Sequence, residues 1–236
     1  MKQLFLYGCP CFEVTSKEVA ENFLLTKINE GKGGYTAAIN ALKLVSYNED
    51  PATKDVIDKA ILQTPDGFGA QLAFRLQHKS KVIKLDLPGL AMELCQKNNL
   101  RLYFLGTTEE NNAAAVKEAQ RIYPGINIVG NMSGFFDGQG QVEKELERTN
   151  PHIVMISMGS PRQEVLSANL HKKFPGIIFV GSGGRMDILA GKLKRAPVWM
   201  QNNGLEWLYR FLQEPKRMFK GQIVGGIKFF KLLLKG

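Results

Sequence analysis

A carboxylate in a short turn is the clearest candidate for acid–base chemistry in this sequence. The run Thr64-Pro65-Asp66-Gly67 places an acidic residue between a proline and a glycine, which is typical of a tight turn at the start of a helix. Asp in such a turn is commonly a helix cap or a turn former. A carboxylate held there could also act as a general base, if a hydroxyl comes within hydrogen-bond reach. The spacing alone leaves both interpretations of Asp66 open.

A second run of residues has the types and order expected at a phosphate site. Gly159-Ser160-Pro161-Arg162-Gln163-Glu164 follows an apolar stretch and is predicted to open a helix. The N–H groups and the positive end of the helix dipole favour phosphate at such a position, and Arg162 or Gln163 could add side-chain donors. An ordinary strand-to-helix turn with polar residues is the alternative.

Several familiar catalytic motifs are absent from the sequence. Gly181-Ser182-Gly183-Gly184 resembles part of a dinucleotide fingerprint, but Met186 stands where the third glycine belongs. The chain has no phosphate-binding loop with a terminal Gly-Lys-Ser/Thr, no Gly-x-Ser-x-Gly and no Asp-x-Asp. Its three histidines, His78, His152 and His171, lack ligand spacing. We therefore expect no cofactor and no metal, with protein cations and helix ends neutralising any bound diphosphate.

The elements that must position these residues alternate between strand and helix. Short apolar runs predict buried strands at Arg101–Leu105, Ile126–Val129, Ile153–Met158 and Ile177–Val180, separated by helices that open near Asp86, Thr108 and Arg162. This alternation predicts an α/β fold with a Rossmann-like parallel sheet and helices on both faces. Ligands bind beyond the carboxyl ends of such strands, where Gly106, Gly159 and Gly181 lie.

The N-terminal third is less regular. It predicts strands at Leu4–Tyr7 and Tyr35–Ile39, a helix at Ser16–Glu30, helical pieces on either side of Asp50-Pro51, a loop at Thr64–Gly69 and a helix at Ala70–His78.

The C-terminal segment carries most of the excess positive charge. From Arg185 onward the chain has eleven Lys or Arg against three acidic residues, within a formal net charge of +9. Phe219, Ile223, Ile227, Phe230 and Leu234 share one helical face, flanked by lysines, as in a helix that lies in an anionic lipid interface. A helix packed on the domain is the alternative, and Gly225-Gly226 weakens either helix. We expect an α/β catalytic domain over 1–195 and a membrane-associating appendage over 196–236.

The remaining composition indicates where the chain works. Three cysteines offer neither a redox nor a zinc spacing, which favours a reducing compartment. The N-terminus lacks a signal-peptide pattern, and no stretch has the roughly 20 apolar residues of a membrane-spanning helix. The expected location is cytoplasmic, peripheral on the inner face of the cell membrane.

Three sequence blocks resemble one enzyme family, the WecG/TagA/CpsF glycosyltransferases, also called glycosyltransferase family 26. The most specific block runs from Leu189-Ala190-Gly191-Lys192-Leu193-Lys194-Arg195-Ala196-Pro197 through Gly204-Leu205-Glu206-Trp207-Leu208-Tyr209-Arg210 to Glu214-Pro215-Lys216-Arg217. The Asp66 turn and the run from Gly159 to Glu164 match two further family motifs, in the right order.

The resemblance implies an inverting, metal-independent transfer of an N-acetylmannosamine-type sugar or its uronic acid, from a UDP-sugar donor to a polyprenyl-diphosphate-linked sugar. It implies a GT-E type of Rossmann-like fold and an anionic membrane surface as partner. Asp66 becomes the expected base, Gln163 an active-site contact, and Arg210 and Arg217 cations over the diphosphate. The full expected substrate-binding set is Asn40, Thr64, Gly106, Gly159, Arg162, Gln163, Gly181, Asp187, Arg195, Arg210 and Arg217.

Two segments depart from the family pattern. Ala38 stands where the family commonly has threonine, with Thr36 two residues earlier, and Lys81 and Lys84 replace an arginine and a glycine. A non-catalytic scaffold of a polysaccharide assembly complex remains an alternative function, as does a nucleic-acid-binding protein that stacks bases on Phe219, Phe229 and Phe230. The leading hypothesis has no nucleic-acid partner, and it leaves a homo-oligomer open.

Overall fold

The computed structural model describes residues 1–202, 205–213 and 215–234, without the side chains of 202, 210 and 216–223. The chain forms two compact units. The first unit comprises residues 1–19, 38–85 and 195–236, and the second comprises residues 20–37 and 86–194. Because the chain passes between them several times, each unit is built from segments that are far apart in sequence. The proposed domains 1–195 and 196–236 stay a prediction.

A six-stranded sheet has the order β4-β3-β8-β7-β5-β6. Its strands are β3 (Gly34–Ile39), β4 (Leu62–Pro65), β5 (Leu102–Gly106), β6 (Ile128–Met132), β7 (Ile153–Ser157) and β8 (Ile178–Gly181). The pairs β3–β8, β7–β8, β5–β7 and β5–β6 are parallel. Every residue of β5 and β7 is buried, as expected of strands covered on both faces. The predicted α/β parallel sheet is confirmed.

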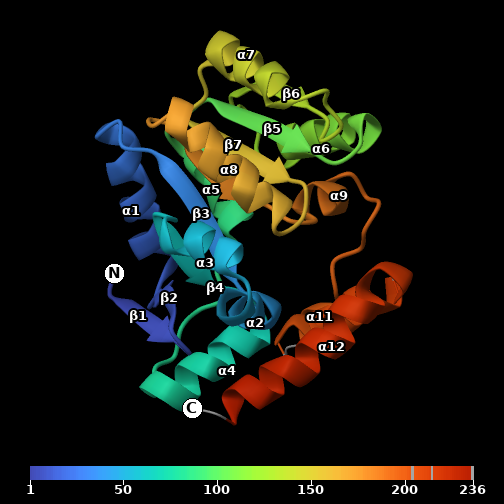
Figure 1. Ribbon diagram of the computed structural model, residues 1–236. Coiled ribbons are helices and arrows are strands. Elements are labelled where there is room, and N and C mark those ends of the chain that lie inside the picture. The colour runs from blue at the N-terminus through green and yellow to red at the C-terminus, as the bar shows by residue number, and fades with distance from the viewer. Residues whose placement is uncertain (203–204, 214, 235–236) are drawn as a thin grey trace. The chain divides into compact units, whose positions relative to one another are not determined.

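Helices flank the strands of the second unit. They are α1 (Lys17–Asn29, whose first residues belong to the first unit), α5 (Leu87–Lys97), α6 (Glu109–Ile122), α7 (Gln139–Thr149), α8 (Arg162–Lys173) and α9 (Arg185–Leu189). Figure 1 shows α8 in front of the sheet and α5 behind it. The predicted starts at Asp86 and Thr108 are confirmed, because each side chain accepts a hydrogen bond from the backbone N–H three residues on. Such N-caps stabilise a helix by about 1 kcal/mol.

The first unit joins a hairpin to helices. The hairpin pairs β1 (Gln3–Leu6) with β2 (Cys9–Phe12), and the helices are α2 (Ala41–Glu49), α3 (Pro51–Asp58), α4 (Gly67–His78), α10 (Val198–Asn202), α11 (Glu206–Gln213) and α12 (Pro215–Leu233). Tyr7 and Gly8 form the hairpin turn at φ 49° and 83°, the positive values that a two-residue type I′ turn requires. The strand β2 was not predicted, and the predicted loop at Thr64–Gly69 is wrong, because β4 ends at Pro65 and α4 begins at Gly67.

The C-terminal helix α12 packs on α2 and α4 through one face only. A Cβ at Gly225 would lie 2.2 Å from Leu42 Cδ2, so the glycine allows α12 to approach α2 closely. Phe229 is buried on this face, while Val224, Ile227 and Phe230 are more than half exposed. The two glycines therefore have a packing role that offsets their cost to the helix. Buried Phe229 is not available to stack on a base, which weakens the nucleic-acid alternative.

Two further sequence expectations bear on the fold. All three cysteines are free and buried. No described helix is both long and apolar enough to cross a membrane.

Candidate active site

Three loops of the second unit meet at the carboxyl ends of β5, β7 and β8. The Thr107 N–H donates to the Ser157 carbonyl at 2.9 Å, and the Ser182 N–H donates to the Ile156 carbonyl at 2.8 Å. The Ser157 hydroxyl donates to the Gly183 carbonyl. These bonds join the loops that follow the three strands, so the predicted residues Gly106, Gly159 and Gly181 belong to one cluster at this edge of the sheet.

Glycine is required where these loops approach one another. A Cβ at Gly106, which has φ 130°, would lie 2.3 Å from the Ser157 carbonyl oxygen. A Cβ at Gly181 would lie 2.6 Å from Gln163 Nε2. A side chain at Gly106 would overlap backbone, so this glycine sets the approach of the two loops, whereas a side chain at Gly181 would displace the Gln163 amide. Gly159 differs, because a Cβ there would meet open space and its φ of 74° is what favours glycine.

Gln163 lies in the first turn of α8 and is hydrogen-bonded to the loop after β8. It is 6% exposed, its Oε1 accepts from the Gly183 N–H at 3.2 Å, and its Nε2 donates to Glu164 Oε1 at 3.1 Å. Its neighbours Gly159, Ser160 and Arg162 are exposed before and at the start of α8. The helix therefore presents an accessible N-terminus and an exposed guanidinium, a combination suited to a phosphate group.

Asp187 connects α9 to the loop after β5. Its Oδ1 accepts from Thr107 Oγ1 at 2.5 Å and from Asn111 Nδ2 at 3.1 Å. Thr107 has a φ of 50°, an uncommon value for a β-branched residue, of the kind found at functional sites. Sequence reasoning named Asp187 and missed Thr107 and Asn111. Both residues could have been suspected, because they lie just after a predicted buried strand and on either side of the helix cap at Thr108.

An ion pair reinforces the same loop region. Arg185 Nη1 lies 3.1 Å from Asp86 Oδ2, and the Arg185 side chain is only 17% exposed. Asp86 also caps α5, so one carboxylate fixes both the start of α5 and the start of α9.

Asp66 belongs to the first unit, where the ends of two neighbouring strands meet. Its backbone N–H donates to the Ile39 carbonyl at 2.8 Å, which places it beside Asn40. Asp66 and Asn40 are the N-cap residues of α4 and α2. A Cβ at Gly69 would lie 2.7 Å from Ala41 Cβ, so the first turns of these helices are in contact. Two helix N-termini therefore converge on the residues that follow β3 and β4, where an anionic group is favoured.

The side chains at these two caps are used differently. Asn40 Oδ1 accepts from the Lys43 N–H at 2.9 Å, as an ordinary cap does. Asp66 makes no side-chain hydrogen bond to the first turn of α4, and its side chain is half-buried. Asp50 offers the contrast within the same unit, because its carboxylate accepts from the Ala52 and Thr53 N–H groups. The interpretation of Asp66 as a capping side chain is therefore not supported, and the general-base hypothesis is kept.

The remaining predicted binding residues are Thr64, Arg195, Arg210 and Arg217. Thr64 is 1% exposed within β4. Arg195 is exposed on the segment between α9 and α10. The positions of Arg210 in α11 and Arg217 in α12 are described, but their side chains lie outside the described part of the structure. Among the described residues, no group of three or more His, Cys, Asp or Glu could hold a metal ion.

A parallel α/β sheet with helices on both faces defines a Rossmann-like class of fold. Comparison with protein families is more specific. The model of the glycosyl transferase WecG/TagA/CpsF family matches residues 5–236, so the chain belongs to this family of glycosyltransferases.

Two curated relatives are similar to the chain. One from Bacillus spizizenii is 28% identical over 195 residues, which are 81% of this chain and 76% of that protein. One from Bacillus subtilis is 28% identical over 193 residues, 80% of this chain and 75% of that protein. Both are named N-acetylglucosaminyldiphosphoundecaprenol N-acetyl-beta-D-mannosaminyltransferase.

Proposed function

We propose that this protein transfers an N-acetylmannosamine-type sugar, or its uronic acid, from a UDP-sugar to a polyprenyl-diphosphate-linked N-acetylglucosamine acceptor. The observation that carries the proposal is the family match over nearly the whole chain, together with the acceptor and the transferred sugar in the names of both relatives. Sugar transfer of this kind belongs to the synthesis of a bacterial surface polysaccharide.

The proposed mechanism is a direct displacement with inversion. The relatives' names specify a β product, and an α-linked nucleotide donor reaches a β product in one step by inversion. Such a step needs one base to take the proton of the acceptor hydroxyl as the new glycosidic bond forms and the bond to the diphosphate breaks. Asp66 is the proposed base, because its turn resembles a family motif and its backbone lies beside Asn40, where the starts of α2 and α4 converge. The converging N-termini of α2 and α4 favour the acceptor's phosphates nearby.

The second unit supplies the proposed donor site. The exposed start of α8 and Arg162 would bind the departing diphosphate, which carries the negative charge that develops in the transition state. Gln163 and Asp187 would keep the loops around it in position, since each bridges two segments. Arg210 and Arg217 are proposed to add positive charge over the same diphosphate. We propose that no metal is needed, because these cations and helix ends replace it and the sequence lacks Asp-x-Asp.

The exposed face of α12 is the proposed membrane contact. Val224, Ile227 and Phe230 are 52%, 55% and 65% exposed on the side of α12 away from its packed face, and Lys231 is exposed beside them. Lys228 is also exposed, but its Nζ lies 2.7 Å from Glu49 Oε2 of α2. An apolar stripe with an exposed lysine beside it suits an anionic lipid surface, to which such a lysine adds about 1 kcal/mol. A peripheral location on the cytoplasmic face of the membrane follows from this proposal and from the lipid-linked acceptor.

The test is a transfer assay with defined substrates. The protein is incubated with UDP-N-acetylmannosamine, UDP-N-acetylmannosaminuronic acid or UDP-N-acetylglucosamine and a farnesyl-diphosphate-linked N-acetylglucosamine, with and without EDTA. We expect a disaccharide from one of the first two donors, a β linkage by NMR and no effect of EDTA. The absence of any transfer would refute the proposed activity, an α linkage would refute inversion, and loss of activity in EDTA would refute metal independence.

A further inference from the structure

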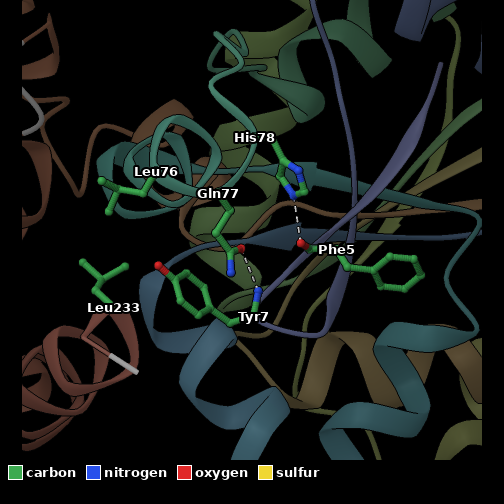
Figure 2. Close-up of a pocket in the computed structure, with 6 residues that line it drawn as sticks. All are labelled: Phe5, Tyr7, Leu76, Gln77, His78 and Leu233. Atoms are coloured by element: carbon green, nitrogen blue, oxygen red, sulfur yellow. Dashed lines mark hydrogen bonds between the residues drawn. The ribbon is translucent and has the colours of Figure 1, made fainter. Parts of the chain in front are cut away.

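A groove of about 570 Å³ lies in the first unit, between the β1–β2 hairpin, the end of α4 and the end of α12. It is lined by Phe5, Tyr7, Leu76, Gln77, His78 and Leu233. Figure 2 shows the phenol of Tyr7 pointing toward the space between Leu76 and Leu233. This volume is within the range of small-molecule sites, and none of the lining residues belongs to the candidate active site.

Hydrogen bonds hold the two sides of the groove together. The Tyr7 N–H donates to Gln77 Oε1 at 2.9 Å, and His78 Nε2 lies 2.9 Å from the Phe5 carbonyl oxygen (Figure 2). On the other side of the turn, Asn48 Nδ2 donates to the Tyr7 carbonyl at 3.2 Å. The positive φ of Tyr7 is therefore fixed by bonds from two helices, and the groove is formed before any ligand arrives.

Large apolar side chains that line the groove are exposed, beside polar ones. Leu76 is 57% exposed and Phe5 is 59% exposed, values that leave large apolar side chains in water unless something covers them. Leu234, 88% exposed, continues this apolar surface onto the stripe of α12. The exposed apolar side chains of the groove, and their continuation onto α12, suit a hydrocarbon chain.

The helix α4 relates this groove to the proposed base. Asp66 directly precedes α4, while Leu76 and Gln77 lie in its last turn. At 1.5 Å per residue the two ends are about 16 Å apart. The portion of the acceptor that separates the reacting hydroxyl from the lipid is one sugar ring and a diphosphate in series, which extend over a comparable length. A lipid in the groove and a sugar hydroxyl at Asp66 can therefore belong to the same molecule.

We propose that this groove binds the first isoprene units of the polyprenyl-diphosphate acceptor. The inference rests on the proposed function, and it adds a binding site for the lipid chain that is separate from the catalytic residues. The acceptor would lie along α4, with its sugar at the N-terminal end and its hydrocarbon at the C-terminal end.

The experiment compares two soluble acceptors without vesicles, so that membrane binding plays no part. N-acetylglucosamine is linked through diphosphate either to farnesyl or to methyl, and kcat/KM is measured for each. In Leu76→Glu we expect the farnesyl-to-methyl ratio of kcat/KM to fall at least tenfold, because a carboxylate then faces the isoprene units. Ile122→Glu, on the exposed side of α6 in the second unit, is the matched control and should keep the wild-type ratio. Thermal unfolding confirms that both variants are folded.

Binding is measured separately from activity, by calorimetry with farnesyl diphosphate and with inorganic pyrophosphate. We expect wild-type protein to bind farnesyl diphosphate at least tenfold more tightly than pyrophosphate, and Leu76→Glu to lose this preference. Equal binding of the two ligands by wild-type protein would overturn the inference, even if no transfer is seen in the first assay. An unchanged acceptor ratio in an active Leu76→Glu would also overturn it and leave the proposed function standing. A dimer that Leu76→Glu dissociates in sedimentation would assign the groove to a second copy instead.

Discussion

Replacing Gly106 by alanine tests the close approach of β5 and β7 that builds the donor loops. Gly106 pairs with Ser157 in the parallel ladder, and an added Cβ would lie 2.3 Å from the Ser157 carbonyl oxygen. Ordinary contacts of this kind are 3.4 Å or longer, so the two strands must separate by about 1 Å. Overpacking of this size costs about 1 to 3 kcal/mol, in addition to the strain of a side chain at φ 130°.

Gly138 provides a matched control for that strain. It has φ 136°, close to the value at Gly106, but a Cβ there would meet nothing within 4 Å. Gly138→Ala should therefore cost only the backbone strain, about 1 to 3 kcal/mol. Gly106→Ala should cost the same strain and, in addition, about 1 to 3 kcal/mol for the overlap of its Cβ with Ser157.

Urea unfolding measures both free energies, and calorimetry measures UDP binding by each variant. Gly106→Ala should also weaken UDP binding at least tenfold, because the strand shift displaces Thr107 from Asp187. Gly138→Ala should leave UDP binding unchanged. Equal losses of unfolding free energy in the two variants would refute the close contact of Gly106 with Ser157, and unchanged UDP binding by Gly106→Ala would remove this loop from the donor site.

Two further predictions address pH and the membrane. Burial, and secondarily the charge of Arg101, lower the pKa of His152, whose Nδ1 accepts a hydrogen bond from the Arg101 N–H. The contribution of His152 to the unfolding free energy should therefore be fully present above about pH 6.5. It should be lost as the pH drops through the lowered pKa. His152→Asn should reduce this slope in urea titrations between pH 7 and 5, and an unchanged slope would exclude His152 as its source. Phe230→Glu should lower binding to vesicles of anionic phospholipid at least tenfold, since it places a carboxylate on the exposed stripe, whereas Ile122→Glu should not; equal vesicle binding by both would refute α12 as the contact.

The sheet was predictable from sequence because its strands are buried on both faces. Runs such as Ile153–Met158 are apolar except for Ser157, and a short apolar run bounded by polar or turn residues is typical of a strand buried on both faces. The strands β2 and β4 were missed for the opposite reason. Cys-Pro-Cys in β2 and Thr-Pro at the end of β4 contain prolines, and proline demotes a short run as a strand candidate.

The site was predictable only in part. The glycines at strand ends and the Asp66 turn could be identified from neighbouring residues in the sequence. In the structure they lie at the carboxyl ends of β5, β7 and β8 and at the start of α4. The contact of Thr107 with Asp187 joins residues 80 apart in sequence, so no local pattern contains it. Gly225 shows the same limit, because its cost to α12 is visible in the sequence whereas the approach to Leu42 that offsets it is a tertiary contact.

The central claim is that Asp66 takes the proton of the acceptor hydroxyl. The most direct measurement is kcat for Asp66→Asn with a UDP-sugar and the farnesyl-linked acceptor, beside Asp50→Asn, which changes another N-cap carboxylate of the first unit. We predict a loss of about 10²- to 10⁴-fold in Asp66→Asn, with UDP binding and unfolding free energy retained, and wild-type turnover in Asp50→Asn. Turnover within a few-fold of wild type in a folded Asp66→Asn would contradict the account.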